Sequence, residues 1–447
     1  MLHLDEAHER LIENLATFLC GKTNSWRVLL VLDVLASHRL VLWCPPTRRE
    51  AARRDLDRRL REAGGAYWSG HILEGQGPSE IPDGAWQREA WGQARRVGDG
   101  AVNLRVLDRH LAKAGWFDAP ADPPWRLGRS RKSGAAVCAF YSFKGGVGRS
   151  TALAAAALQF AARGDRVAVL DADLDSPGVG SLLHGHDGAV ADVGLVDYLL
   201  EAPLVGGARG CRLTDYHHRC PPDLHGGRGE ILVFPAGRMN RRYIEKLARL
   251  DYGANSTERS RHPFVALLEQ IRTELDPRWI LVDARAGLGE VSGFLTGGLC
   301  HVYVLFGTLA EASWRGLGLV LDRLGGQRLR SLGSQCECFV AAAMIPRLQE
   351  ERYERSVAAF TDRASDVFSA SYYAESGERD SAWTVDDVAN SSDAPHVPTS
   401  LPYDPRLALF AGLEEVASSV LLQSGSPYEE LADRMRMSSE QLREAGR

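Results

Sequence analysis

The chain has 447 residues, of which 45% are hydrophobic and 25% are charged, with a formal net charge of -5. This length suits two or three cores rather than one, and the composition excludes a disordered or fibrous chain. The slightly acidic balance gives no overall case for nucleic acid or an anionic membrane as a partner, although it does not exclude a local basic patch.

The cysteines and apolar runs indicate the environment of the chain. The eight cysteines are scattered and several stand in apolar runs, which predicts buried free thiols rather than a disulfide framework. The N-terminus has early acidic residues and no long apolar segment, unlike a signal peptide. The longest apolar run, 151–162, is too short to span a bilayer. We therefore expect a cytoplasmic protein without a membrane partner.

Residues 1–118 form a first predicted domain of mixed α/β or helical character and unassigned role. Helical periodicity opens it, and residues 26–46 then offer one or two apolar strands. A helix follows, for which Thr47 and Glu50 predict a capping box. Seven arginines lie on it: Arg48, Arg49, Arg53, Arg54, Arg58, Arg59 and Arg61. Acidic residues alternate with them at pairing distances, so we favour a salt-bridged, solvated face over a nucleic-acid surface.

Residues 119–135 are rich in Pro, Gly and Ser and predict a linker. A second domain, 136–423, then alternates short apolar strands with helical stretches. The predicted strands lie at 135–143, 166–171, 230–237, 278–287, 301–307 and 338–346. This pattern predicts an α/β fold with a mostly parallel sheet covered by helices on both faces. Residues 424–447 predict a polar tail with a terminal helix and a frayed end.

A glycine-rich segment, FYSFKGGVGRSTALA at 140–154, follows the first strand of this domain. Glycines between a buried strand and a helix N-terminus allow successive backbone N–H groups to approach phosphate oxygens. Ser150 stands where phosphate-binding loops place a hydroxyl that binds Mg²⁺. The common pattern G-x-x-x-x-G-K-[ST] nevertheless fails twice, because Phe143 replaces its first glycine and Arg149 its lysine.

The stretch KGGVGRST resembles the deviant Walker A loop, K-G-G-x-G-K-[ST], of the ParA/MinD class of P-loop ATPases. The loop, with its arginine and an aromatic residue before it, resembles the loop of a variant subfamily of that class. The resemblance implies that Lys144 is a signature lysine, which reaches the nucleotide of a partner subunit so that ATP closes a dimer. The implied nucleotide-binding residues are Gly145, Gly146, Val147, Gly148, Arg149, Ser150 and Thr151.

Three further segments resemble motifs of the class and come in the same order. In VLDADLDSPG, Asp173 matches the aspartate that positions the attacking water, and Asp171 lies beside phosphates and metal. In WILVDARAGLG, Asp283 would hold the Mg²⁺ shell and Gly287 would present its N–H to the γ-phosphate. The implied metal-binding residues are thus Ser150, Asp171 and Asp283.

The last of these segments, LPYDPRLAL, resembles the late loop that packs against the base, which implies contacts from Pro402 and Tyr403. The resemblance covers about residues 134–423. The class usually has proline near position 285, where this chain has Arg285, in agreement with the arginine-loop variant.

The resemblance implies an ATP- and Mg²⁺-dependent switch that forms a nucleotide-dependent homodimer and passes its state to an unidentified protein partner. Because arginine does not replace lysine conservatively at a crowded phosphate, we expect slow, dimerisation-dependent hydrolysis, with Lys144 and Asp173 as catalytic residues. Relatives with the arginine loop are often encoded beside regulatory or defence-type bacterial proteins, which suggests signalling or defence.

Several alternatives stay open. They are a DNA-partitioning ATPase with an N-terminal DNA-binding region, a bacterial tyrosine kinase, an ATP-binding regulator with negligible hydrolysis, and a scaffold that has lost its nucleotide. A separate zinc site is a further alternative, since Cys211, His217, His218, Cys220 and His225 lie in one stretch. Their spacing matches no familiar finger, so we favour a polar insertion.

Overall fold

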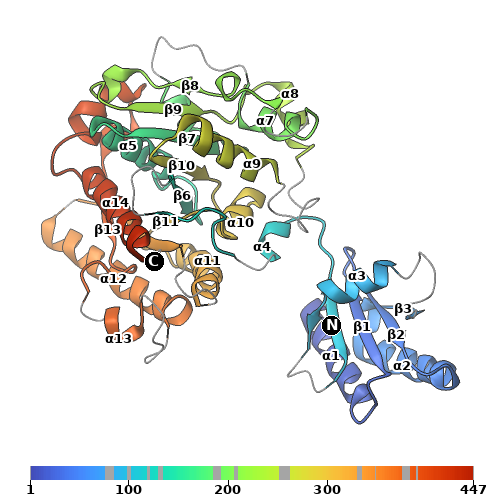
Figure 1. Cartoon of the computed structure of the whole chain (residues 1–447). Coiled ribbons are helices and arrows are strands. Elements are labelled where there is room, and N and C mark those ends of the chain that lie inside the picture. Colours follow the sequence, from blue (N-terminus) through green and yellow to red (C-terminus); the bar gives the residue numbers. More distant parts are fainter. Residues whose placement is uncertain are drawn as a thin grey trace. The chain divides into compact units, whose positions relative to one another are not determined.

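The computed structural model describes twelve stretches of the chain. They are residues 2–75, 85–97, 102–117, 121–128, 134–184, 193–205, 210–250, 262–329, 335–347, 349–374, 383–388 and 391–445. The chain divides into two compact units, Met1–Ala112 and Lys113–Arg447 (Figure 1).

The first unit is a five-stranded mixed sheet with helices on both faces. Its strands are β1 (Arg27–Leu32), β2 (His38–Trp43), β3 (Trp68–Glu74), β4 (Arg95–Arg96) and β5 (Leu104–Asp108), in the order β3-β2-β1-β5-β4. Helices α1 (Leu4–Leu19) and α2 (Arg49–Gly64) pack on one face, and α3 (Ala85–Gln93) packs on the other. The apolar segment 26–46 is therefore a β-hairpin of two antiparallel strands.

Arginines of α2 form ion pairs with acidic residues on the same helix, as the sequence predicts. Arg54 pairs with Glu50, Arg59 with Asp55, and Arg61 with Asp57, each four residues along the helix. The capping box is wrong, however. A 3₁₀ turn (Pro46–Arg48) leads into α2, and the residue at the N-cap, Arg48, makes no side-chain cap hydrogen bond.

The second unit is built on an eight-stranded sheet, which confirms the predicted α/β class. Its strands are β6 (Ala136–Ser142), β7 (Arg166–Ala172), β8 (His218–Arg219), β9 (Glu230–Phe234), β10 (Trp279–Ala284), β11 (Val302–Gly307), β12 (Glu337–Pro346) and β13 (Thr399–Tyr403). The order is β13-β12-β11-β6-β10-β7-β9-β8, and every pairing is parallel except β8 with β9. The strand before the glycine loop is thus central.

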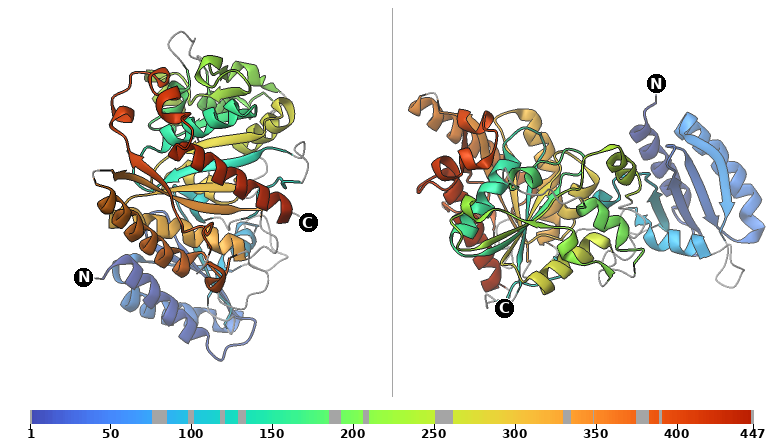
Figure 2. Two further views of the ribbon diagram at one scale, coloured as in Figure 1. Left: turned by 90° about the vertical axis from the view of Figure 1, so that its left-hand side faces the viewer. Right: turned by 90° about the horizontal axis from the view of Figure 1, so that it is seen from above.

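Helices cover both faces of this sheet and form two cores (Figure 2). One face carries α5 (Arg149–Ala162) and α14 (Pro427–Ala445). The other carries α7 (Leu195–Glu201), α9 (Pro263–Gln270), α10 (Glu290–Thr296), α11 (Glu311–Leu329) and α12 (Glu350–Ser371). Shorter helices are α4 (Ala114–Phe117), α6 (Val179–Leu182), α8 (Arg241–Leu247) and α13 (Val385–Val388). Within the stretches described above, no helix combines the length and apolar character needed to cross a membrane.

The structure differs from the expected linker and tail. The division falls between Ala112 and Lys113, and the indole N–H of Trp116 donates to the Gly289 carbonyl at 2.8 Å. In the described part of the expected linker, the Leu127 amide donates to the Gln335 side chain at 2.9 Å. The expected tail forms α14, which buries Leu431 and Met435 in the core that also contains α5. These segments are integral to the second unit.

Candidate functional site

The glycine loop connects the central strand β6 to α5. Gly146 and Gly148 have φ angles of +73° and +77°, in the left-handed region that glycine adopts at little cost. Helix α5 begins at Arg149, directly after the loop, and its alanine-rich turns are buried against the sheet. The loop therefore lies at the N-terminus of a long buried helix, where backbone N–H groups and the helix dipole favour an anion.

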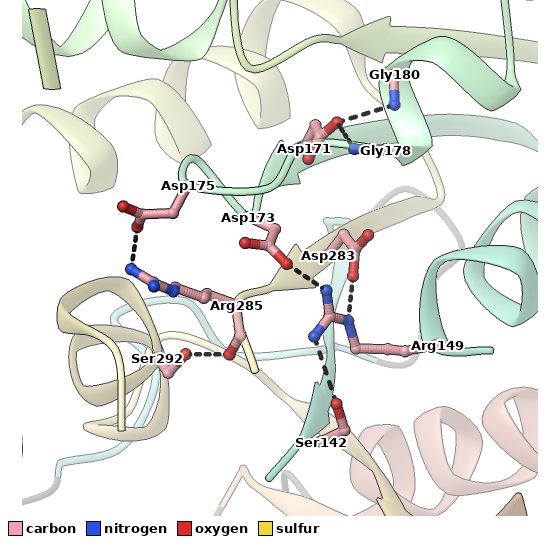
Figure 3. A network of polar contacts seen from close by, with 10 residues as sticks. All are labelled: Ser142, Arg149, Asp171, Asp173, Asp175, Gly178, Gly180, Asp283, Arg285 and Ser292. Carbon is pink, nitrogen blue, oxygen red and sulfur yellow. Dashed lines mark hydrogen bonds and ion pairs between the residues drawn. The ribbon is translucent and has the colours of Figure 1, made fainter. Parts of the chain in front are cut away.

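Arg149 points toward carboxylates at the ends of neighbouring strands (Figure 3). Its Nε donates to Asp283 Oδ1 at 2.5 Å, and its Nη2 donates to Asp173 Oδ2 at 2.8 Å. A longer bond, 3.4 Å, runs from Nη1 to the Ser142 hydroxyl at the end of β6. Only 7% of Arg149 is exposed. The guanidinium thus links the ends of β6, β7 and β10, whereas the resemblance assigns it to phosphates; that assignment stays a prediction.

Burial and ion pairing shift the pKa values of the Arg149 cluster. Burial opposes the charge of Arg149, but Asp283 and Asp173 together raise its pKa above the ordinary value. Burial also raises the pKa of Asp283, against the lowering influence of Arg149 and the Ser150 hydroxyl. The ion pair therefore stabilises the charged forms of both groups in a buried environment, where an unpaired carboxylate would raise the free energy of the fold.

Asp171 lies near the end of β7, and its predicted position beside phosphates and metal stays a prediction. It faces Asp283 across the β7–β10 pairing, but its Oδ2 accepts hydrogen bonds of 3.0 Å from the amides of Gly178 and Gly180. Figure 3 shows this side chain directed away from Arg149. Burial, with a further contribution from Asp283, raises the pKa of Asp171 to about 8.

Replacing Asp171 with asparagine is expected to change how stability depends on pH. The folded-state pKa of about 8 lies above the ordinary value of 3.8, so the protonated acid stabilises the fold. That contribution is complete below about pH 4 and is lost as the pH rises through about 8. Asparagine cannot ionise and keeps an oxygen acceptor. The melting temperature of the variant, measured relative to that of the parent, should therefore be higher at about pH 8.5 than at about pH 5. The same difference in melting temperature at both pH values would contradict this.

The carboxylates retain oxygens that suit a divalent cation. Asp171 Oδ1, Asp173 Oδ1 and Asp283 Oδ2 are buried without a hydrogen-bond partner. Mg²⁺ prefers such oxygen ligands and usually takes only one or two protein carboxylates beside phosphate oxygens. This agrees with the absence, among the described residues, of a preformed cluster of three or more acidic, histidine or cysteine side chains. The residues present therefore fit Mg²⁺ that arrives with a nucleotide.

A cavity of about 260 Å³ adjoins the loop, and Arg149, Asp173 and Asp283 are not among its lining residues. It extends from the loop at Gly146 and Gly148 to the end of β13, where Pro402 and Tyr403 line it. Their predicted contact with a base stays a prediction. Thr151, Met344, Asp404 and Tyr428 are also among its lining residues. The cavity joins the loop to the base-binding segment implied by the resemblance.

The predicted signature lysine and Gly287 lie at the same end of the sheet. Lys144 is exposed, and its Nζ lies 5.4 Å from the ring centre of Phe143. The Phe143 ring occupies the space that a side chain on Gly316 of α11 would need. The Gly287 amide donates to the Ser142 carbonyl at 3.0 Å. In this state Gly287 therefore bonds to the loop strand, and its contact with a γ-phosphate stays a prediction.

Several site residues were missed by the sequence-based prediction. Ser142 contributes to the Arg149 cluster, and Met344 reaches the cavity from an irregularity in β12, where its φ is +63°. Tyr428 comes from the segment taken as a tail; its spacing to Leu431 and Met435 is the helical signal that could have identified a packed helix. The stretch of Cys211 to His225 brings no metal cluster together within the described residues.

A glycine loop between a central parallel strand and a buried helix, with acidic residues at the ends of two nearby strands, is the arrangement typical of P-loop NTPases. A family model described as ParA, NUBPL iron-transfer P-loop NTPase, matches residues 135–197. This match confirms the resemblance to the ParA/MinD class for the glycine loop and the acidic segment that follows it. The comparison with curated proteins found no match.

The solved structures to which this chain is similar include proteins named MinD and ParA. The cell division ATPase MinD of Pyrococcus furiosus is 18% identical with a TM-score of 0.42, over 68% of this chain and 99% of its own. MinD of Pyrococcus horikoshii, complexed with Mg-ADP, is 17% identical with a TM-score of 0.42, over 67% and 96%. The pNOB8 ParA bound to nonspecific DNA is 15% identical with a TM-score of 0.37, over 70% and 97%.

Proposed function

We propose that the protein is an ATP-binding molecular switch of the ParA/MinD class that hydrolyses ATP slowly and acts as a nucleotide-dependent homodimer. The observation that carries this proposal is the position of the glycine loop. The loop lines a cavity that reaches Pro402 and Tyr403. Arg149, directly after the loop, contacts the buried carboxylates Asp173 and Asp283. A triphosphate along the loop amides would have its base in the cavity and its terminal phosphate beside the carboxylates.

The roles of individual residues follow from this arrangement. Ser150 and Asp283 would hold Mg²⁺, and the bound ion would neutralise phosphate charge. Asp173 would accept a proton from the attacking water, the role that the resemblance implies, once its carboxylate is free of the guanidinium of Arg149. Tyr428 and Tyr403 offer aromatic surface to the base from the cavity wall. Lys144 is exposed at the mouth of the loop, as a contact to a second copy would require.

A second candidate is an ATP-binding regulator with negligible turnover. The contact of Arg149 with Asp173 favours it, since a carboxylate held by a guanidinium is a poor general base. Phosphate release per bound nucleotide separates the two candidates. A regulator would bind Mg-ATP and dimerise without releasing phosphate above the rate of an Asp173 variant.

The pathway is proposed on the resemblance alone: signalling or defence, through an unidentified protein partner. DNA partitioning is less favoured, because the arginines of α2 are largely paired with acids on the same helix. Retention on plain duplex DNA at low salt, in the presence of ATP and lost at high salt, would favour partitioning instead.

Light scattering of the full chain tests the switch with no nucleotide, ADP, ATP and a non-hydrolysable ATP analogue. We expect a dimer only with ATP or its analogue, and Lys144→Ala should remove it, because the loop would lose its contact to the second copy. Lys22→Ala is the matched control, since Lys22 is an exposed lysine that lies 4.4 Å above the ring of Phe18 in the first unit. A dimer that persists in Lys144→Ala would reject this role for Lys144.

A further inference from the structure

Arg149 makes three contacts that a lysine could not make together. Its planar fork reaches Asp283 on β10, Asp173 beyond β7 and Ser142 on β6, so that three separate elements meet at one guanidinium. An ammonium is a compact point charge and has no rigid fork with which to bridge such a set. The arginine at this position therefore has a structural consequence beyond keeping the positive charge.

The same carboxylates are the ligands available to a divalent cation. Arg149 occupies Asp283 Oδ1 and Asp173 Oδ2, while the second oxygen of each carboxylate is buried without a partner. A divalent ion bound to the free oxygen of either carboxylate would lie a few ångströms from the guanidinium in a poorly screened interior. Like charges at that separation repel strongly, so the two cations compete for one carboxylate pair.

We propose that Arg149 is the resident counter-ion of Asp173 and Asp283 and keeps divalent cations out of the nucleotide-free site. A phosphate chain on the loop offers the guanidinium an alternative oxygen pair of matching geometry. Movement of Arg149 to the phosphates would release both carboxylates, so nucleotide and metal enter together. This ordering rests on the proposed function, whereas the competition in the empty protein does not. Arg149 is thus a positioning residue for Asp173 as well as a nucleotide ligand.

Mn²⁺ binding to the nucleotide-free full chain, followed by electron paramagnetic resonance, tests the competition directly. Arg149→Gln removes the positive charge and keeps hydrogen-bond donors, and we expect it to bind Mn²⁺ at least about tenfold more tightly than the parent. Arg149→Lys should lie between them, because an ammonium keeps the positive charge but has no planar fork to bridge both carboxylates. Equal Mn²⁺ affinity of the parent and both variants, whether tight or undetectable, overturns the proposal.

The matched control is Arg285→Gln. Arg285 pairs with Asp175 nearby, but both side chains are about half exposed and neither contacts Asp173 or Asp283 (Figure 3). Its Mn²⁺ affinity should equal that of the parent. An increase as large as that of Arg149→Gln would show a general charge effect and reject the specific role.

A second measurement does not depend on the stability of the glutamine variant. The side-chain Nε–H resonance of Arg149, assigned from its loss in Arg149→Lys, should be observable in the empty parent and shift when Mg-ATPγS binds. If this resonance does not shift on saturation with the nucleotide, the proposed movement of Arg149 from the carboxylates to the phosphates is wrong. If ATPγS fails to raise the melting temperature, the proposed function fails instead, and the Mn²⁺ comparison still decides the competition.

Discussion

Replacing Arg149 with methionine is expected to lower the free energy of unfolding of the second unit by about 3–5 kcal/mol, because it leaves buried carboxylates without their partner. Asp283 is fully buried and Asp173 is 7% exposed, so water cannot replace the guanidinium. Chemical denaturation followed by circular dichroism measures the loss. Adding Asp173→Asn and Asp283→Asn to Arg149→Met should restore much of it, since the buried charges are then gone.

The control for this prediction is Arg163→Met. Arg163 pairs with Asp433 and Glu429 of α14, but its side chain is 25% exposed and those of its partners are 58% and 33% exposed. Such surface pairs contribute at most about 1 kcal/mol. A similar decrease in the free energy of unfolding for Arg163→Met and Arg149→Met would show that the buried cluster contributes no more to stability than a surface ion pair.

Asp173→Asn is expected to lower the rate of phosphate release by about 100- to 10,000-fold, the range that general-base catalysis contributes. Asparagine has nearly the same shape and can still contact Arg149, so affinity for Mg-ATP should change little. Phosphate release under saturating Mg-ATP measures the effect. Asp175→Asn is the neighbouring control, because Asp175 is 51% exposed and pairs with Arg285. Equal rates in the parent and Asp173→Asn would remove Asp173 from the mechanism.

The sheet of the second unit could be predicted because its strands are buried on both faces. Six predicted apolar segments correspond to β6, β7, β9, β10, β11 and β12, and the glycine loop follows the first of them. The domain limits were less predictable, since proline and glycine also occur in chain that packs against a core. Trp116 anchors α4 by its indole N–H, a contact that composition does not reveal.

The motifs predict which residues form the candidate site, but they cannot predict the hydrogen-bond partners of those residues. The order of the motifs predicts that Arg149, Asp173 and Asp283 converge, because the carboxyl ends of parallel strands meet at one edge of a sheet. It cannot show whether the guanidinium faces phosphates or carboxylates, since both are acceptors of the same kind. Met344 was unpredictable for another reason: a local irregularity of β12 gives a non-glycine residue a positive φ.

Hydrogen–deuterium exchange of the full chain, with and without saturating Mg-ATPγS, tests directly whether a nucleotide occupies the glycine loop. The account predicts slower exchange in peptides that cover residues 144–151 and 401–404, because loop amides would donate to phosphates and the base would fill the cavity lined by Pro402 and Tyr403. Unchanged exchange in the loop at saturating nucleotide, or protection confined to the first unit, would contradict it.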